Sequence, residues 1–364
     1  MKTIYKQLFL FCIVLFVFQS CVEPFETGTE NFEDILVVEA TITNELKYQE
    51  ILLSRTSRLE EENMFYELNA QVTVIDDAKN TYNFQEIDSG KYKSTIKFKA
   101  ELNTSYTLKI TTEKGKSYTS NSQQLSSIKG IDSLYAVKSI NNFGKDGISI
   151  LVDSYDPDGN SKYYRYEYVE TYQVLAPYAV LQKKRVCYKT VKTNIIKQKQ
   201  TIALSEDRIK QLPIIFINES DYKTTYRYSI LVKQYVQSQE AFSYYKTLNK
   251  FSGLKSVLSQ VQKGVFLGNI TADKDREEIV LGFFEVTSVS SKRIYFKHHD
   301  FFPDNPYPRY FRFCDLRALS VESILSGDWV YAGVNEAGNP LMVETECGDC
   351  TSFASNVKPT FWID

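Results

Sequence analysis

The sequence predicts a mainly β protein made of two β-sandwich domains of the immunoglobulin or fibronectin type. Short runs rich in Val, Ile, Thr, Tyr and Phe recur about every 8–12 residues, separated by turn-forming Asp, Asn, Gly and Ser. The 364 residues include 26 Tyr and 23 Phe, which favour strands, but only 15 Gly and two His. With 43% hydrophobic and 24% charged residues, the chain can form well-packed cores, which excludes a disordered protein.

The first twenty residues have the features of a secretory signal peptide. Lys2 and Lys6 precede an unbroken run of eleven apolar residues at positions 8–18. As a helix this run is about 16 Å long, about half of a bilayer core, so it is too short for a membrane anchor. Ser20 then precedes Cys21, as in a lipoprotein signal. We expect cleavage before Cys21 and attachment of diacylglycerol to its sulfur; the alternative is a chance cysteine near an ordinary cleavage site.

Residues 21–32 are expected to form an acidic tether. Glu23, Glu26 and Glu30 lie in this stretch, which also contains Pro and Gly and has too few apolar residues to build a core. The alternative is an ordinary solvated linker. Beyond the signal, no other run approaches 18 apolar residues, so acyl chains are the expected membrane attachment.

The N-terminal domain is assigned to residues 33–125 as an immunoglobulin-like sandwich. Val72 and Val74 share one face of their segment while Gln71 and Thr73 share the other, which is the two-residue period of a strand. The same patterns predict strands at residues 35–43, 48–54, 70–76, 81–87, 91–98, 105–113 and 116–125.

Residues 126–364 are assigned to a second β-sandwich with helical insertions and long loops. Ser238 can cap a helix near 239–261, in which Ala241, Tyr244, Tyr245 and Leu248 recur at helical spacing; after Gly253, residues 254–261 are expected to form a further short helix. Prolines from residue 301 onward favour loops. The expected strands lie at residues 147–155, 163–174 and 225–236, with a strand pair at 278–286 and 292–296 joined around 288–291.

Four cysteines remain after Cys12 in the signal and Cys21 are set aside. An even number in an exported chain favours two disulfides, for which three connectivities exist. We expect Cys187 and Cys314 each to pair with one member of the Cys347-Gly-Asp-Cys350 motif, which would staple the C-terminal segment onto the domain body. Zinc or redox roles are the alternatives, although the chain has only one CxxC motif.

Few residues point to catalysis or to cofactors. His298 and His299 are adjacent, and in a strand they would point to opposite faces, so a surface or capping role is favoured over metal binding. No hydrolase elbow, phosphate-binding loop or dinucleotide fingerprint is present, so we expect no enzyme activity, no cofactor and no metal. A glycosidase needs only two carboxylates, which leaves a carboxylate-based hydrolase open.

Two surface features are candidates for ligand contact. Tyr164, Tyr166 and Tyr168 alternate along one strand and can stack on sugars, although a half-buried sheet face is the simpler interpretation. Residues 183–199 carry seven Lys and Arg, for which a solvated hairpin is favoured over an acidic partner or a lipid headgroup. With a formal charge of −2, the chain has no general basic field for nucleic acid.

Several features recur together along the chain: Cys21, the strand at 35–43, residues 163–170, Cys187-Tyr188, and the ending Cys347-Gly-Asp-Cys350 followed by KPTFW at 358–362. In these features the chain resembles a Bacteroidota family of outer-membrane lipoproteins with a domain of unknown function. Members are often encoded beside TonB-dependent receptors, and an acidic stretch after the lipidated cysteine resembles their cell-surface export signal. The resemblance implies a surface-exposed accessory lipoprotein of such a transporter, and it supplies no catalytic residues.

The sequence therefore predicts a non-enzymatic, cell-surface lipoprotein of the outer membrane that assists a TonB-dependent nutrient transporter. A free-standing glycan-binding or adhesion module is the first alternative. A carboxylate-based hydrolase is the second.

Overall fold

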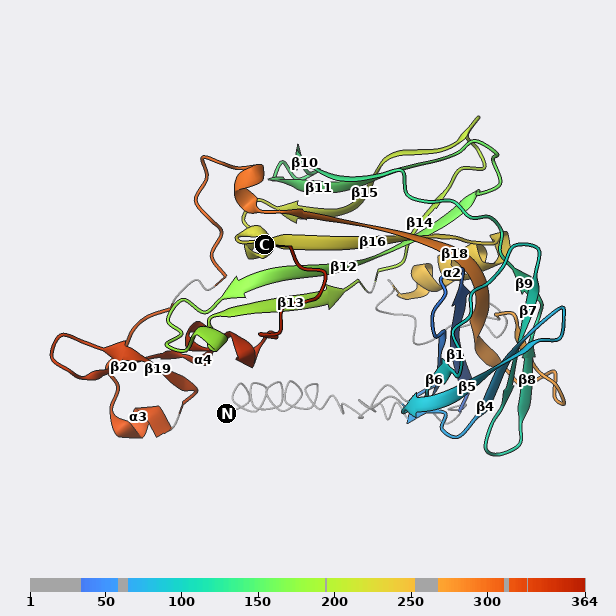
Figure 1. Ribbon diagram of the computed structural model, residues 1–364, viewed down its shortest axis with the longest axis horizontal. Coiled ribbons are helices and arrows are strands. Elements are labelled where there is room, and N and C mark those ends of the chain that lie inside the picture. Colours follow the sequence, from blue (N-terminus) through green and yellow to red (C-terminus); the bar gives the residue numbers. More distant parts are fainter. Residues whose placement is uncertain are drawn as a thin grey trace, which may run out of the picture.

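The computed structural model describes residues 34–57, 65–193, 195–252, 268–310, 314–325 and 327–363. The signal peptide, Cys21, the tether and the short helix at 254–261 lie outside these residues. The protein is mainly β with few helices, as predicted (Figure 1). Its strands form one large sheet of fifteen, a second of three and a third of two.

The first nine strands cover the N-terminal third of the chain, and most follow the predicted segments. They are β1 (Leu36–Thr43), β2 (Glu50–Arg55), β3 (Phe65–Tyr66), β4 (Gln71–Asp76), β5 (Thr81–Asp88), β6 (Lys91–Ser94), β7 (Ser105–Thr111), β8 (Ser117–Ser120) and β9 (Gln123–Gln124). The remaining elements are β10 (Ser133–Ile140), β11 (Asp146–Asp156), β12 (Tyr163–Leu175), β13 (Val186–Lys192), β14 (Lys197–Gln200), β15 (Asp207–Asn218), β16 (Tyr228–Val236), α2 (Gln239–Ser252), β17 (Ile270–Ala272), β18 (Val280–Phe296), α3 (Val321–Leu325), β19 (Trp329–Val334), β20 (Pro340–Glu344) and α4 (Thr345–Gly348).

A mainly aliphatic core, here called the first core, fills the N-terminal part. Along β1 the side chains alternate, with Leu36, Val38, Ala40 and Ile42 buried while the intervening residues face outward. Late segments complete this core, because β17 pairs with β8 and the first half of β18 pairs with β1. The domain boundary between residues 125 and 126 stays a prediction, and the structure adds residues 270–272 and 280–287 to the strands around the first core.

Strand β18 runs through both halves of the molecule. Residues 280–287 pair in parallel with β1, and residues 288–296 pair antiparallel with β16. The predicted strand pair joined around 288–291 is therefore wrong, since one strand of 17 residues replaces it. The serines that suggested a turn are held in the sheet, where the Ser290 hydroxyl accepts from the Ile131 amide at 3.1 Å.

The second core lies between two layers of strands (Figure 1). One layer is the sheet β10-β11-β15, and the other contains β12, β16 and the second half of β18. Tyrosine rings from β12 and β16 fill much of the space between the layers. Strands β13 and β14 both pair with one edge of β12, so the basic segment is not the hairpin favoured by the sequence.

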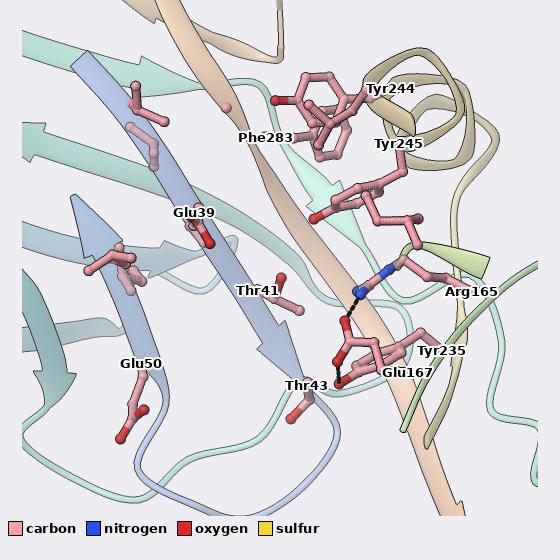
Figure 2. Close-up of a pocket in the computed structure, with 18 of the residues that line it drawn as sticks. Glu39, Thr41, Thr43, Glu50, Arg165, Glu167, Tyr235, Tyr244, Tyr245 and Phe283 are labelled. Carbon is pink, nitrogen blue, oxygen red and sulfur yellow. Dashed lines mark hydrogen bonds and ion pairs between the residues drawn. The ribbon is translucent and has the colours of Figure 1, made fainter. Parts of the chain in front are cut away.

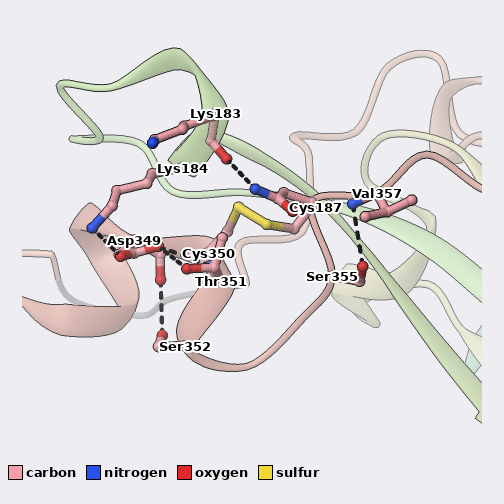
Figure 3. Close-up of a disulfide and its surroundings, with 10 residues drawn as sticks. Lys183, Lys184, Cys187, Asp349, Cys350, Thr351, Ser352, Ser355 and Val357 are labelled. Carbon is pink, nitrogen blue, oxygen red and sulfur yellow. Dashed lines mark hydrogen bonds and ion pairs between the residues drawn. A yellow bond between two sulfur atoms is a disulfide. The ribbon is translucent and has the colours of Figure 1, made fainter.

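The C-terminal segment is more ordered than the predicted loops. It contains the hairpin β19–β20, whose turn forms because Asn335 Oδ1 accepts from the amides of Ala337 and Asn339. Disulfides join Cys187 to Cys350 (Figure 3) and Cys314 to Cys347, so each isolated cysteine reaches one member of the CxxC motif, as expected.

Around the first disulfide, polar contacts also hold the C-terminal segment against the body of the protein (Figure 3). Lys184 forms an ion pair with Asp349 at 2.5 Å, and Asn356 donates to the Lys183 carbonyl at 3.0 Å. The Tyr188 ring on β13 meets the Trp362 ring edge to face, at 5.0 Å between centroids.

Candidate functional site

An open cleft of about 700 Å³ lies between helix α2 and the outer face of the large sheet (Figure 2). It lies where β18 passes from the first core to the second. The cleft is lined from β1, β2 and the segment between them by Val37, Val38, Glu39, Ala40, Thr41, Thr43, Lys47, Glu50, Ile51 and Leu52, and from later segments by Lys91, Arg165, Glu167, Ile196, Tyr235, Tyr244, Tyr245, Leu248, Leu281, Gly282 and Phe283.

The floor of the cleft is the face of β1 and β18 that points away from the first core. Strand alternation places Glu39 and Thr41 on this face, and Glu39 is the register partner of Phe283. Gly282 has φ +119°, and a Cβ there would lie 2.0 Å from the Val38 carbonyl oxygen. Glycine is therefore required for the close approach of the two strands beneath the cleft.

Helix α2 supplies an aromatic wall. The Ser238 hydroxyl accepts from the Ala241 amide at 3.1 Å and caps the helix, as its sequence predicted. Ala241 is buried, which fixes the helix on the sheet and turns Tyr244 and Tyr245 toward the cleft. The Tyr244 ring packs on Phe283 at 5.3 Å between centroids. The rings of Tyr244 and Tyr245 also meet edge to face, at 5.4 Å between centroids, so each ring packs against another.

A buried arginine closes one end of the cleft. Arg165 on β12 is 5% exposed, and it donates to Glu285 at 2.9 Å and also to Glu167. Its guanidinium lies over the rings of Tyr235 and Tyr245, at 4.1 and 4.7 Å from their centroids. Two carboxylates and two aromatic faces thus surround one cation.

These contacts determine the protonation states of Arg165 and of the neighbouring tyrosines. Burial works to lower the pKa of Arg165, but the charges of Glu285 and Glu167 outweigh it and hold the pKa above its usual value. Burial raises the pKa of Tyr244 to about 12, and burial together with Glu285 also raises the pKa of Tyr245. Both phenols are therefore neutral at neutral pH.

The tyrosines singled out from the sequence do not form this site. Tyr164 and Tyr166 are 0% and 1% exposed in the second core, and Tyr168 packs against that core from β12. The Tyr164 hydroxyl donates to Asp207 and the Tyr166 hydroxyl donates to Gln234. Stacking of Tyr164 and Tyr166 on a sugar is therefore wrong, because both rings are occupied inside the protein.

The two histidines lie apart from the cleft, just after β18. His298 is completely buried and stacks on Phe302, while the His299 ring stacks on Tyr307 at 4.0 Å between centroids. The surface role favoured by the sequence is wrong for His298. Within the described ranges, no cluster of His, Cys, Asp and Glu is arranged to hold a metal ion.

Sequence reasoning missed the cleft because its residues come from distant segments of the chain, at positions 37–52, 91, 165–167, 196, 235–248 and 281–283. Helix α2 gave the only signal, since Tyr244 and Tyr245 fall on its apolar face. Nothing in one sequence places that face over Glu39, some two hundred positions earlier, because β18 pairs with β1 only in the folded chain.

Residues 22–293 match a protein family described as a domain of unknown function, DUF4249. No curated protein is significantly similar in sequence. Among the residues that the structure describes, no helix is long and apolar enough to cross a membrane.

Proposed function

The chain belongs to the DUF4249 family, and we propose that it is a non-enzymatic binding lipoprotein of the bacterial outer membrane that assists a TonB-dependent transporter. The cleft beside α2 carries the binding part of this proposal. Its volume of about 700 Å³ is in the range of small-ligand sites, and it combines apolar and aromatic surface with a few charged groups.

The carboxylates at the end of the cleft favour a binding function over hydrolysis, because both are held by other side chains. Glu167 and Glu285 both engage Arg165, and Tyr235 donates to Glu167 at 3.0 Å. A general acid or nucleophile needs a carboxyl group that is free to exchange a proton or attack. These two carboxylates instead have fixed structural partners, and Glu50 pairs with Lys91, so Glu39 has no second free carboxylate beside it for a two-carboxylate mechanism.

The membrane and transporter parts rest on the N-terminal sequence and on the family resemblance. The apolar run at 8–18, Ser20 and Cys21 support lipid attachment, and Glu23, Glu26 and Glu30 support a tether between the lipid and the folded body. The resemblance to Bacteroidota lipoproteins encoded beside TonB-dependent receptors supports the partner and the cell-surface location.

Two experiments test these parts separately. Cells expressing the full chain are grown with labelled palmitate, and label is expected in the wild type but not in Cys21→Ser. The chain is then purified in mild detergent, where an outer-membrane receptor is expected to copurify. Absence of label would remove the lipoprotein assignment, and repeated absence of any receptor would remove the accessory role.

A further inference from the structure

We propose that the cleft beside α2 selects a small organic cation, whose ammonium group lies between the Glu39 carboxylate and the aromatic wall of Tyr244, Tyr245 and Phe283. This inference rests on the proposed function, because it takes the cleft to be a ligand site. It adds the chemical class of the ligand and names the carboxylate that recognises it.

The charges around the cleft leave one carboxylate available. Lys91 pairs with Glu50 at 3.0 Å, Lys47 pairs with Glu45 at 2.7 Å, and Arg165 pairs with two glutamates. Among the described residues, Glu39 has no ion-pair or hydrogen-bond partner, and its side chain is exposed. With the pairing partners included, five carboxylates (Glu39, Glu45, Glu50, Glu167 and Glu285) face three cations (Lys47, Lys91 and Arg165), which gives the region a net charge of −2.

The aromatic wall is close to this carboxylate. Glu39 and Phe283 are direct partners in the parallel pairing of β1 with β18, so their side chains lie on the same face. The Glu39 charge also acts on the Tyr244 phenol and contributes to the rise of its pKa. A carboxylate beside several aromatic rings favours a cation, because the ring faces carry negative electrostatic potential.

An anionic ligand fits less well. It would face the unpaired Glu39, and both lysines of the lining are already paired with glutamates. The Nε–H of Arg165 lacks an acceptor but is buried, with the guanidinium stacked on Tyr235 and Tyr245. The one Arg165 nitrogen without an acceptor is therefore closed to a ligand in the cleft.

The test uses the full chain in detergent and three probes of similar length: 1,5-diaminopentane, 1,5-pentanediol and glutarate. Calorimetry is expected to show binding of the diamine, weaker binding by at least about tenfold for the diol, and none for glutarate. Added salt should weaken the diamine complex, since part of its affinity is a charge interaction near the surface.

Two matched variants locate the site. Glu39→Gln should weaken diamine binding about tenfold, or about 1.4 kcal/mol. Glu101→Gln, which removes an exposed glutamate paired with Lys99 outside the cleft, should change it less than about twofold. Both glutamates are exposed, so the variants should keep the unfolding temperature of the wild type, which is checked by circular dichroism.

Three results would overturn the inference: no diamine binding at about 10 mM, equal binding of the diol, or unchanged binding in Glu39→Gln. Copurification of a receptor does not depend on these probes. The accessory role can therefore stand when the cation site fails, and a cation site can stand when no receptor is recovered.

Discussion

The two cores of this chain are stabilised in different ways. Val, Ile and Leu side chains dominate both cores, so the difference lies in the tyrosines. In the first core, the buried Tyr92 hydroxyl donates to the Glu67 carbonyl, and the Tyr118 hydroxyl donates to the partly exposed Glu278 carboxylate. In the second core, tyrosine hydroxyls donate to buried carboxylates, Tyr164 to Asp207 and Tyr228 to Glu170. Both disulfides also lie on the side of the second core.

This difference separates two sources of stability. Apolar burial is non-directional and changes little with pH, so the first core should tolerate conservative substitution. Buried polar pairs demand fixed geometry and leave a large penalty when one partner is lost. The second core should therefore be more specific in its packing and more sensitive to pH and to single polar substitutions.

The largest effect is expected from the disulfide that ties the C-terminal segment to the second core. Cys187 and Cys350 are 163 residues apart, and replacing both with Ser should lower the free energy of unfolding by about 5 kcal/mol in the chain-entropy model. Removing Cys314–Cys347, with a separation of 33, should cost about 4 kcal/mol. Urea denaturation gives both values, and a larger loss for the shorter loop would contradict the entropic argument.

The second-largest loss of stability is expected from breaking the buried ion pair between Arg165 and Glu285 at the end of the cleft. Glu285→Ala should lower the free energy of unfolding by about 4 kcal/mol, because Arg165 keeps its buried charge and loses its best-placed partner. The double variant Arg165→Met with Glu285→Leu should recover much of this loss, since neither buried charge remains. Denaturation of the three proteins is compared, and an equal loss in the double variant would show that the pair itself stabilises the fold.

Shortening one apolar side chain in the first core measures the stability that apolar burial alone contributes, for comparison with the polar pairs of the second core. Leu53 is completely buried on β2, and Leu53→Ala should cost about 3 kcal/mol through lost burial and the cavity left behind. The loss should be the same at pH 7 and at about pH 10, because no titrating group is removed. If the loss of stability in Leu53→Ala changed strongly with pH, the first core would not differ from the second in its response to pH.

The smallest effect is expected from alkaline titration of the tyrosines. Burial raises the pKa of Tyr92 to about 12 and raises that of Tyr228 well above its usual value, and the neighbouring Glu170 adds to the rise at Tyr228. The unfolded chain loses these protons near pH 10 while the folded protein keeps them, so stability is complete below about pH 10 and falls as the pH rises.

Phenylalanine variants separate the two contributions to this alkaline loss. At about pH 11 each phenol should cost up to about 1.4 kcal/mol, and the loss from Tyr228 should continue to higher pH than that from Tyr92. Tyr228→Phe should therefore flatten the pH profile of the denaturation midpoint over a wider range than Tyr92→Phe. Identical profiles for the two variants would mean that the tyrosines of the two cores titrate alike.

Local patterns in the sequence predicted most of the strands, the Ser238 cap and the mainly β class. Period-two alternation is a local signal, and in β1 and β4 it matches the buried face. The sequence misjudged residues 288–291, since serines are common in turns and their hydroxyl partners are visible only in the fold. The sequence also did not reveal that Tyr164 and Tyr166 are buried, because the strands that cover the two rings, β10, β11 and β15, come from other parts of the chain.

The shared strand β18 has a consequence for how the chain folds. Residues 36–43 must wait for residues 280–287 before β1 gains its second neighbour, although a ribosome delivers β1 early. Until then, the backbone amides and carbonyls along one edge of β1 have no partners, so another exposed strand can pair with them. Such a long-range parallel contact slows folding, so the newly made N-terminal half would benefit from a chaperone until the rest of the chain arrives.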